Sequence, residues 1–370
     1  MTVSAKRNMK ILILYGYNKS LLSGFFQELS EKLCTDGFEV DNFYLKHEKA
    51  SFNQKGVLVY GEERRGFVSN YKAIYKMIKQ SKPDVIISNF SYINPAVLFG
   101  KLLGVKHNIA WFHTAFGHTK PSQLKVWNKS LYLRMADLVF TNSTSLETEM
   151  HQVYKVAKEK TRRVPFWTNI NKYISTGKDI KVSPHLEVLN IGCPGRLLED
   201  KNHELVIKAL SELKQSSKKH LMLYIAGDGP YKKELQRLVR DLKLEDAVVF
   251  LGLLNVEEMS SFYKNMDVVV LPSFHEAFGL VFIEAIALGT PVIVSKMFGA
   301  LSFLDTQSFP LEDFCFNPEA IQELIDKLEP YLNNNGLTAA YFKRMYDETF
   351  EKEVIYKQIK GLILNTHETS

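Results

Sequence analysis

Three stretches in the second half of the chain hold residues that could bind an anion and sugar hydroxyls. In the first, Gly195–Lys201 (GRLLEDK), Arg196 and Lys201 flank the expected start of a helix. The unpaired N–H groups and the dipole of a helix N-terminus add to the charge of such cations, so a pyrophosphate would suit this place. Alternatively, the two cations form surface salt bridges with Glu199 and Asp200.

The second stretch is Ala226–Pro230 (AGDGP), which follows the apolar run Leu221–Ile225. A pair of glycines in such a place often only turns a strand into a helix. A dinucleotide-binding fingerprint would need a third glycine where this chain has Lys232, and an acidic residue at the end of the next strand. The acidic residues that follow precede that strand instead, so a dehydrogenase is disfavoured.

The third stretch, Ser273–Ile293, carries two carboxylates eight residues apart. Glu276 is expected in a loop after a strand, and Glu284 inside the next helix. Gly279 would let the backbone approach a ligand closely at the start of that helix. A buried carboxylate is costly unless it accepts hydrogen bonds, and Glu284 has apolar neighbours, so we expect hydroxyl donors around it. Sugar hydroxyls would suit both carboxylates.

The sequence lacks the motifs that several other kinds of chemistry require. The chain has no G-x-x-x-x-G-K-[ST] phosphate loop and no G-x-S-x-G nucleophile elbow. His275–Glu276 begins like a zinc motif, but Gly279 stands where the second histidine would be. No D-x-D occurs, so diphosphate binding through a metal is not indicated, and we expect neither a metal nor another cofactor.

The length and composition bound the class of protein. A chain of 370 residues exceeds what one hydrophobic core usually spans, so two domains are expected. Apolar residues make up 45% and charged residues 24%, which excludes collagen-like and intrinsically disordered proteins. Only three cysteines occur, far apart, which disfavours a disulfide scaffold and a structural zinc site and favours a reducing cytoplasm.

Short apolar runs alternate with helical patterns through both halves of the chain. Strands are expected at Lys10–Tyr15, Asp84–Asn89, Asn108–Phe112, Leu138–Thr141, Leu186–Ile191, Leu221–Ala226, Val248–Leu251, Asp267–Leu271 and Pro291–Ser295. Helices are expected at Leu21–Leu33, Asn70–Lys82, Pro95–Leu103, Pro121–Met135, Lys201–Gln215, Tyr231–Leu242, Val256–Lys264 and Phe278–Leu288. Continuously apolar strands that alternate with helices indicate α/β domains with parallel sheets covered on both faces. Two Rossmann-like domains are therefore predicted.

The domain boundary is expected within Arg163–Pro184, a basic stretch followed by a polar one. The first domain would comprise residues 1–167 and the second residues 185–344. A long helical pattern, Leu337–Leu364, closes the chain, and its last part, about residues 345–370, would pack back on the first domain. Since ligands of open α/β sheets bind beyond the carboxyl ends of the strands, the expected site is a cleft between the domains.

The net charge of +6 conceals an asymmetry. Residues 1–170 hold 25 Lys and Arg against 13 Asp and Glu, whereas residues 171–370 hold 22 against 28. Asn70–Lys82 and Gln123–Arg134 place lysines between apolar and aromatic residues at helical spacing, as in helices that lie on anionic membranes. The alternative is a solvated surface with no partner. A nucleic-acid partner is disfavoured because no such motif accompanies the charge.

No targeting or membrane-spanning segment is expected. The apolar stretch Ile11–Tyr15 is too short for a signal peptide, and Leu280–Val294 is interrupted by Glu284, Gly289 and Pro291. The chain is therefore predicted to be cytoplasmic, or peripheral at the inner face of the cytoplasmic membrane.

Taken in order, these motifs resemble the carboxyl-terminal domain of family-4 glycosyltransferases, which are retaining enzymes of the GT-B fold. The resemblance covers roughly residues 186–295, and the first half matches only in general pattern. It is carried by Gly195–Arg196, Lys201, Ala226–Pro230, Pro272–Ser273, Glu276–Glu284 (E-x-F-G-L-x-x-x-E) and Gly289–Ile293 (G-x-P-V-I).

The resemblance implies a role for each matching residue. Arg196 and Lys201 would hold the donor diphosphate, Glu276 the hydroxyls of the donor sugar, and Glu284 those of the ribose. His113 in WFHT would be the strand-end histidine near the reacting carbon, although a histidine of the core is the alternative. The further donor-binding residues would be Gly16, Gly195, Gly227, Leu253, Phe278, Gly279 and Leu280. Members of the family commonly have a Gly-rich loop after the first strand, where this chain has only Gly16 and Gly24.

The reaction that the resemblance implies is the transfer of a hexose or N-acetylhexosamine, with retention, from a nucleotide-sugar to an acceptor hydroxyl. A UDP-sugar is favoured as donor, and a glycan or lipid-linked acceptor of bacterial cell-envelope synthesis as acceptor. The leaving diphosphate would take the acceptor's proton, so no protein nucleophile is expected. Two alternatives remain: an epimerase or phosphorylase of the same fold, and a non-catalytic subunit that binds a nucleotide-sugar.

Overall fold

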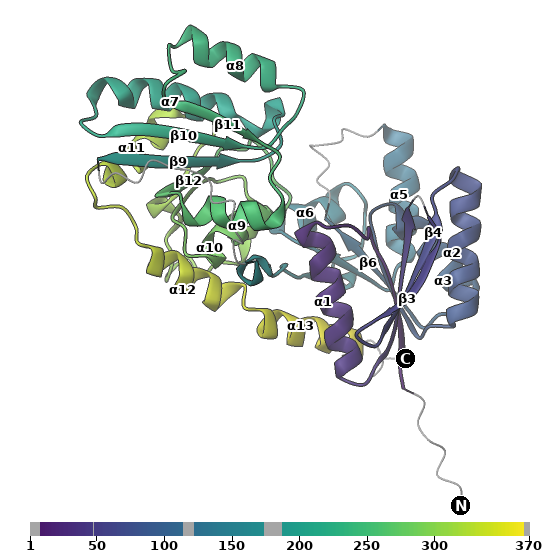
Figure 1. The fold of residues 1–370 in the computed structure, drawn as a ribbon. Coiled ribbons are helices and arrows are strands. Elements are labelled where there is room, and N and C mark those ends of the chain that lie inside the picture. Colours follow the sequence, from purple (N-terminus) through teal and green to yellow (C-terminus); the bar gives the residue numbers. More distant parts are fainter. Residues whose placement is uncertain (1–7, 47, 114–121, 174–186, 366–370) are drawn as a thin grey trace, which may run out of the picture. The chain divides into compact units, whose positions relative to one another are not determined.

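The computed structural model describes residues 8–46, 48–113, 122–173 and 187–365, which form two compact units (Figure 1). The N-terminal domain contains the chain up to Phe166 and the segment from Lys352 onwards, and the C-terminal domain is Trp167–Glu351. Each domain is an α/β structure built on a mainly parallel sheet, as predicted. The first residue of two expected elements, Pro121 and Leu186, lies outside the described residues, as does part of the expected boundary Arg163–Pro184.

The N-terminal domain has an eight-stranded sheet with the order β3-β4-β2-β1-β5-β6-β7-β8. The pairing of β3 with β4 is antiparallel, and the other neighbours are parallel. The strands are β1 (Lys10–Leu14), β2 (Glu39–Lys46), β3 (Ala50–Gln54), β4 (Val57–Glu63), β5 (Val85–Asn89), β6 (His107–Phe112), β7 (Leu138–Thr141) and β8 (Thr161–Arg163).

Strands β2 to β4 carry a mixed polar pattern, which is why the continuous-run criterion missed them. Asp41 and Asn42 are buried in the middle of β2. Their cost of burial is offset by polar partners, because Asp41 lies 3.0 Å from the Lys10 ammonium and Asn42 accepts from the Ser30 hydroxyl. The edge strand β3 is largely exposed. The prediction of parallel strands buried on both faces of the sheet therefore holds for only part of this domain.

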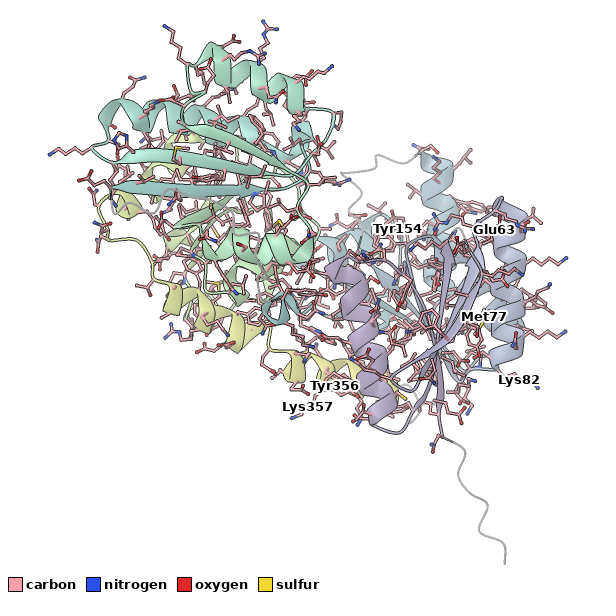
Figure 2. All side chains as sticks on the ribbon, in the orientation of Figure 1. Glu63, Met77, Lys82, Tyr154, Tyr356 and Lys357 are labelled. Atoms are coloured by element: carbon pink, nitrogen blue, oxygen red, sulfur yellow. The ribbon has the colours of Figure 1, made fainter. Side chains whose placement is uncertain are left out.

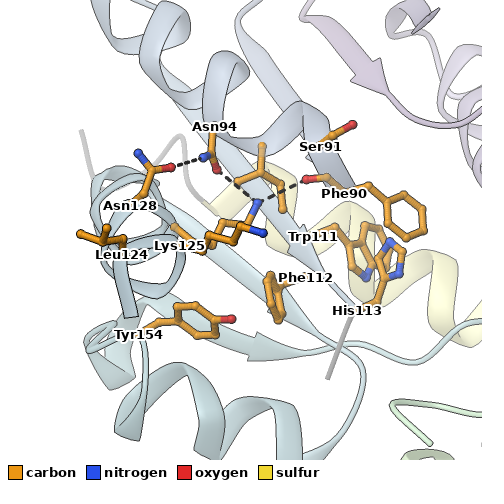
Figure 3. Close-up of a pocket in the computed structure, with 12 residues that line it drawn as sticks. Phe90, Ser91, Asn94, Trp111, Phe112, His113, Leu124, Lys125, Asn128 and Tyr154 are labelled. Carbon is orange, nitrogen blue, oxygen red and sulfur yellow. Dashed lines mark hydrogen bonds between the residues drawn. The ribbon is translucent and has the colours of Figure 1, made fainter. Parts of the chain in front are cut away.

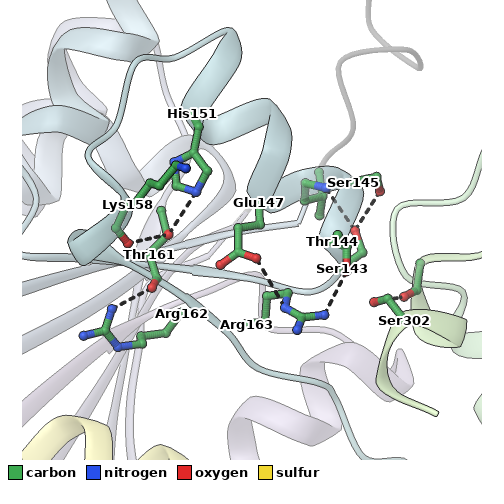
Figure 4. A network of polar contacts seen from close by, with 12 residues as sticks. Ser143, Thr144, Ser145, Glu147, His151, Lys158, Thr161, Arg162, Arg163 and Ser302 are labelled. Atoms are coloured by element: carbon green, nitrogen blue, oxygen red, sulfur yellow. Dashed lines mark hydrogen bonds and ion pairs between the residues drawn. The ribbon is translucent and has the colours of Figure 1, made fainter. Parts of the chain in front are cut away.

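Helices cover both faces of the N-terminal sheet (Figure 1). They are α1 (Leu21–Thr35), α2 (Phe67–Ser81), α3 (Ile93–Leu102), α5 (Gln123–Met135), α6 (Thr144–Gln152) and α13 (Lys352–Asn365). The Ser143 hydroxyl caps α6 by accepting from the Leu146 N–H (3.1 Å). Arg163 then fixes the first turn of α6 through Thr144 (2.8 Å) and Glu147 (3.3 Å), as Figure 4 shows.

The C-terminal domain has a six-stranded sheet with the order β11-β10-β9-β12-β13-β14, and all its pairings are parallel. The strands are β9 (Val188–Pro194), β10 (His220–Ala226), β11 (Val248–Gly252), β12 (Val268–Leu271), β13 (Val292–Ser295) and β14 (Cys315–Phe316). The helices are α7 (His203–Ser216), α8 (Lys232–Asp241), α9 (Val256–Lys264), α10 (Leu280–Ala287), α11 (Ile321–Leu332) and α12 (Ala339–Thr349).

The long helical pattern expected at Leu337–Leu364 is helical in the structure but divided into two helices, α12 and α13. The chain leaves α12 at Phe350, whose ring is fully buried against Phe278 (6.1 Å between ring centroids) and Phe282 (6.5 Å) in the C-terminal domain. Burying that ring interrupts the continuous helix, and α13 begins at Lys352.

Helix α13 packs on α1 within the N-terminal domain. The Glu353 carboxylate lies 2.7 Å from the Lys32 ammonium, and Asp36 accepts hydrogen bonds from Tyr356 and Lys360, both at 2.6 Å. Tyr356 is buried against the domain whereas Lys357 is exposed (Figure 2). Among the helices that the structure describes, none is long and apolar enough to cross a membrane.

Candidate functional site

Three adjacent strands of the C-terminal domain end in closely packed glycines. The Gly195 N–H after β9 donates to the Ala226 carbonyl (2.9 Å), and the Gly227 N–H after β10 donates to the Gly252 carbonyl at the end of β11 (2.8 Å). Gly227 has φ of 147°, and an added Cβ would overlap the Gly195 carbonyl oxygen. The chain's own packing therefore requires a glycine at 227, whether or not a ligand lies beside it.

Lys201 and Glu276 form an ion pair at the carboxyl ends of β9 and β12. The Lys201 Nζ lies 2.6 Å from Glu276 Oε2, although the residues are 75 positions apart. The two side chains are 11% and 22% exposed, so the pair is largely buried yet open to a ligand. Two of the predicted site residues, Lys201 and Glu276, are thus in direct contact.

The loops that carry this pair are tied together by the backbone. Asn202 adopts the left-handed conformation, and its amide donates to the carbonyls of Pro272 (3.3 Å) and Pro318 (2.9 Å). The Phe274 N–H donates to the Asp200 carbonyl (2.9 Å). Because these bonds hold the loop after β9 against the loop after β12, they fix the distance between Lys201 and Glu276.

Helix α7 begins two residues after Lys201. Arg196 is exposed, and no ion pair of its guanidinium is found among the described residues. His203, the first residue of α7, is buried, and burial lowers the pKa of its imidazole to about 4, so it is neutral at pH 7. The segment therefore combines two cations with a helix N-terminus, the combination that binds phosphate groups.

Gly279 places the Glu276 loop against the start of α10. It is the N-cap of α10 with φ of 96°, and an added Cβ would overlap the Phe298 ring. The backbone of Glu276 pairs with that of Phe298, and its carbonyl accepts from the Gly299 N–H (3.1 Å). An added Cβ on Gly279 would also lie 3.2 Å from Glu276 Cγ, so the start of α10 adjoins the Glu276 side chain. The first N–H groups of a helix have no helical acceptor and are therefore potential ligand donors beside Glu276.

Glu284 is buried inside α10 and accepts a hydrogen bond from the Tyr263 hydroxyl of α9 (2.9 Å). Loss of hydration raises the pKa of the Glu284 carboxyl to about 7, and the hydrogen bond from Tyr263 opposes that rise. The same burial raises the pKa of Tyr263 well above its usual value. The protein itself thus supplies one of the expected hydroxyl donors, Tyr263, a residue that the sequence motifs do not indicate.

The other predicted donor-binding residues differ in what they expose. Leu253, just after β11, is 76% exposed, so its side chain is available to a ligand. The Phe278 ring is buried against Phe303 and Phe350, so this residue could contact a ligand only through its backbone. Leu280 is half-buried in the first turn of α10.

In the N-terminal domain, His113 directly follows β6 and lines a cavity of about 540 Å³ (Figure 3). Its ring stands edge-on to Phe90 (4.0 Å between centroids), and its Nε2 has no hydrogen-bond partner in the described part of the chain. Burial lowers the pKa of this imidazole to about 4. His113 is therefore neutral at pH 7, and it lines the cavity with its Nε2 buried. Gly16, after β1, borders open space.

Two family models match this chain, one in each half. The model described as glycosyl transferases group 1 matches residues 180–347, and the model described as glycosyltransferase family 4 matches residues 24–171. Among solved structures, Anabaena Alr3699/HepE in complex with UDP superposes with a TM-score of 0.78 at 19% identity, over 96% of this chain and 100% of that one. At this identity the likeness shows the fold alone.

Two relatives resemble this chain in sequence to a similar degree. An uncharacterized glycosyltransferase of Methanocaldococcus jannaschii, MJ1607, is 29% identical over 59% of this chain, and the match spans 59% of that protein's length. A Campylobacter jejuni α-1,4-N-acetyl-D-galactosaminyltransferase, named for an undecaprenol diphosphate-linked substrate, is 28% identical over 76% of this chain and 71% of its own. Glycosyltransferase models thus match both halves of the chain, and its two α/β domains share their fold with HepE, so the chain belongs among the glycosyltransferases of the GT-B type.

Proposed function

We propose that this glycosyltransferase moves a hexose or N-acetylhexosamine, with retention of configuration, from a UDP-sugar to an acceptor hydroxyl. The observation that carries the proposal is the Lys201–Glu276 pair, which puts a cation and a carboxylate side by side at the strand ends. The cation can bind a phosphate group, and the carboxylate can accept hydrogen bonds from sugar hydroxyls. Support for the donor comes from HepE, which was solved with UDP and with UDP-glucose.

In the proposed complex, Arg196, Lys201 and the start of α7 hold the diphosphate, and no metal is needed. Glu276 accepts hydrogen bonds from the donor sugar, aided by N–H groups at the start of α10. Glu284 accepts from the ribose with the carboxylate oxygen that Tyr263 does not use, because Tyr263 donates to Oε2. Leu253 packs against the base. The cations stabilise the charge that builds on the leaving diphosphate, which takes the acceptor's proton on the same face.

The donor can be identified by thermal stability. We expect UDP and UDP-sugars to raise the melting temperature more than the GDP and ADP counterparts, since a ligand that binds only the folded state stabilises it. At a concentration 100 times its Kd, such a ligand adds about 2.7 kcal/mol to the free energy of unfolding. Release of UDP in the presence of acceptor then measures transfer. If no nucleotide-sugar stabilised the protein and none were consumed, the proposed function would be wrong.

We further propose that the acceptor is lipid-linked, that it serves bacterial cell-envelope synthesis, and that the N-terminal domain docks on anionic membrane to reach it. Helix α5 exposes Leu124, Trp127 and Leu131, with Lys125 between them, and Phe67 and Val68 are exposed at the start of α2. Apolar side chains interspersed with lysines favour an anionic interface. The Campylobacter relative's name, with its undecaprenol diphosphate, supports such an acceptor.

This docking is tested by flotation with lipid vesicles. We expect the protein to float with vesicles rich in phosphatidylglycerol at low salt, and about tenfold less with phosphatidylcholine alone, because basic residues are attracted to the surface charge. Raising NaCl to 1 M, where screening acts within about 3 Å, should reduce the difference. Equal flotation with both kinds of vesicle would contradict the electrostatic attraction. If the protein did not float with either kind, membrane docking itself would be contradicted.

A further inference from the structure

The cavity beside His113 has aromatic walls and two lysines, Lys125 and Lys129. Phe90, Trp111, Phe112 and Tyr154 line it, together with the Lys129 side chain from α5. Figure 3 shows the side chains that line this cavity, with dashed lines for the hydrogen bonds between them. A second cavity of about 370 Å³ shares Lys129 with the first. Lys129 therefore lies in the wall between two cavities.

The Lys129 ammonium has no acidic partner among the residues that the structure describes. It donates to the Phe90 carbonyl (3.3 Å) and to Asn94 Oδ1 (3.1 Å). The Asn94 amide in turn donates to Asn128 Oδ1 (3.0 Å), which turns the Asn94 oxygen toward the lysine. An ammonium has three N–H donors, so one donor and the whole positive charge are left for a ligand.

The surroundings add positive charge rather than neutralise it. In the second cavity Arg64 has no ion pair within the described part of the chain, and its guanidinium lies near the Tyr92 hydroxyl. Desolvation lowers the pKa of Lys129 to about 8, as expected for an ammonium without a counter-anion. By contrast, the half-buried Lys10 of the same domain has a carboxylate partner in Asp41, at 3.0 Å.

We propose that Lys129 binds a phosphate group of the acceptor, whose carbon skeleton lies against the aromatic walls of the cavity beside His113. This inference rests on the proposed function, since it assigns the cavity to the acceptor. A phosphate bound here would accept the free N–H of Lys129 and supply the missing counter-charge. The carbon skeleton could be the alkyl chain of a lipid phosphate or the ring of a sugar phosphate, and the same phosphate chemistry serves both.

The test is calorimetric titration of the full chain with four probes. Octyl phosphate below its micelle concentration represents a lipid phosphate, glucose 1-phosphate represents a sugar phosphate, inorganic phosphate lacks a carbon skeleton, and octyl glucoside lacks the charge. We expect one of the two organic phosphates to bind at least tenfold more tightly than inorganic phosphate and octyl glucoside, and the tighter one identifies the source. Equal binding of inorganic phosphate, or of octyl glucoside, would overturn the proposal.

Two variants of α5 separate a charge contact from the general charge of the helix. Lys129→Met removes the ammonium and should weaken the organic phosphate at least tenfold, as losing a hydrogen bond to a charged group does. Arg134→Met removes one positive charge from an exposed position of the same helix and should leave the affinity unchanged. If both variants bound as the wild type does, Lys129 would not be the anion site.

The pH dependence is a second readout that needs no variant. With a pKa of about 8 in the free protein, Lys129 must regain a proton to bind phosphate above that pH, so the affinity should fall about tenfold from pH 7 to pH 9. His113 (pKa about 4) and Tyr154 (about 12) do not titrate in this range. The other titratable or charged groups that line the two cavities are Lys125, Arg64, Arg65, Tyr71 and Tyr92. An affinity constant over this range would contradict the assignment to Lys129.

UDP binding, measured on the same samples, separates this inference from the proposed function. If UDP binds and neither organic phosphate does, the phosphate site is wrong and the donor site stands. If an organic phosphate binds with the expected dependence on Lys129 and UDP does not, the phosphate site stands and the donor proposal fails.

Discussion

Lys201→Met lowers the rate of sugar transfer by about 10²–10³, the usual cost of removing one electrostatic stabiliser of a transition state. The reason is that the ammonium, held 2.6 Å from Glu276, faces the negative charge that develops on the diphosphate as the sugar departs. The rate is measured as UDP released in the presence of acceptor at saturating donor. The melting temperature of the variant should stay close to that of the wild type, because a neighbouring carboxylate that is 22% exposed remains hydrated.

Lys214→Met is the matched control, since Lys214 forms an ion pair of the same kind with Asp246 (2.8 Å) on the surface of the same domain. Its transfer rate should equal that of the wild type. The double variant Lys201→Met/Glu276→Gln then distinguishes two roles. If the pair only stabilised the fold, removing both charges would restore activity, because no uncompensated charge would remain. We expect no recovery, and full activity in either the single or the double variant would contradict the assignment.

The parts of the fold that could be predicted are those whose signal is local. Strands β1, β5, β9 and β12 were found because continuous apolar runs identify strands buried on both faces. β2 was missed because Asp41 and Asn42 interrupt its apolar run. The free-energy cost of burying these two side chains is offset by polar partners distant in the chain. Likewise, nothing local marks Phe350 as the end of α12, since the reason lies in its contacts with Phe278 and Phe282.

The same distinction holds for the site. Spacing and family resemblance singled out Lys201, Glu276 and Glu284 individually, but could not show that the first two contact each other, because an ion pair between residues 75 positions apart leaves no periodic signal. Tyr263, the partner of Glu284, belongs to a different helix and to no motif. In the sequence Lys129 is one of several lysines on a basic helix. Only the packing around it shows that, among the residues the structure describes, its ammonium has no acidic partner.

Glu284→Gln should stabilise the protein at pH 8 and weaken donor binding. The pKa of this carboxyl is about 7 in the folded state, above its usual 4.5. The folded state therefore holds the proton more tightly than the unfolded state, so the group's stabilising contribution is complete below pH 4.5 and is lost as the pH rises to 7. The difference amounts to about 3 kcal/mol of unfolding free energy. Glutamine mimics the protonated carboxyl at every pH and avoids this loss.

The measurement is chemical unfolding at pH 5 and pH 8, followed by titration with UDP at pH 8. We expect the stabilisation by Glu284→Gln to be larger at pH 8 than at pH 5 by about 2–3 kcal/mol, and UDP to bind about tenfold more weakly, because an amide is a poorer acceptor for ribose hydroxyls than a carboxylate. Glu212→Gln, on the exposed surface of α7, should change neither quantity. If Glu284→Gln stabilised the protein without weakening UDP binding, the buried charge of Glu284 would serve a purpose other than nucleotide binding. The expected combination would show that the chain retains an unfavourable buried charge because the ribose needs it.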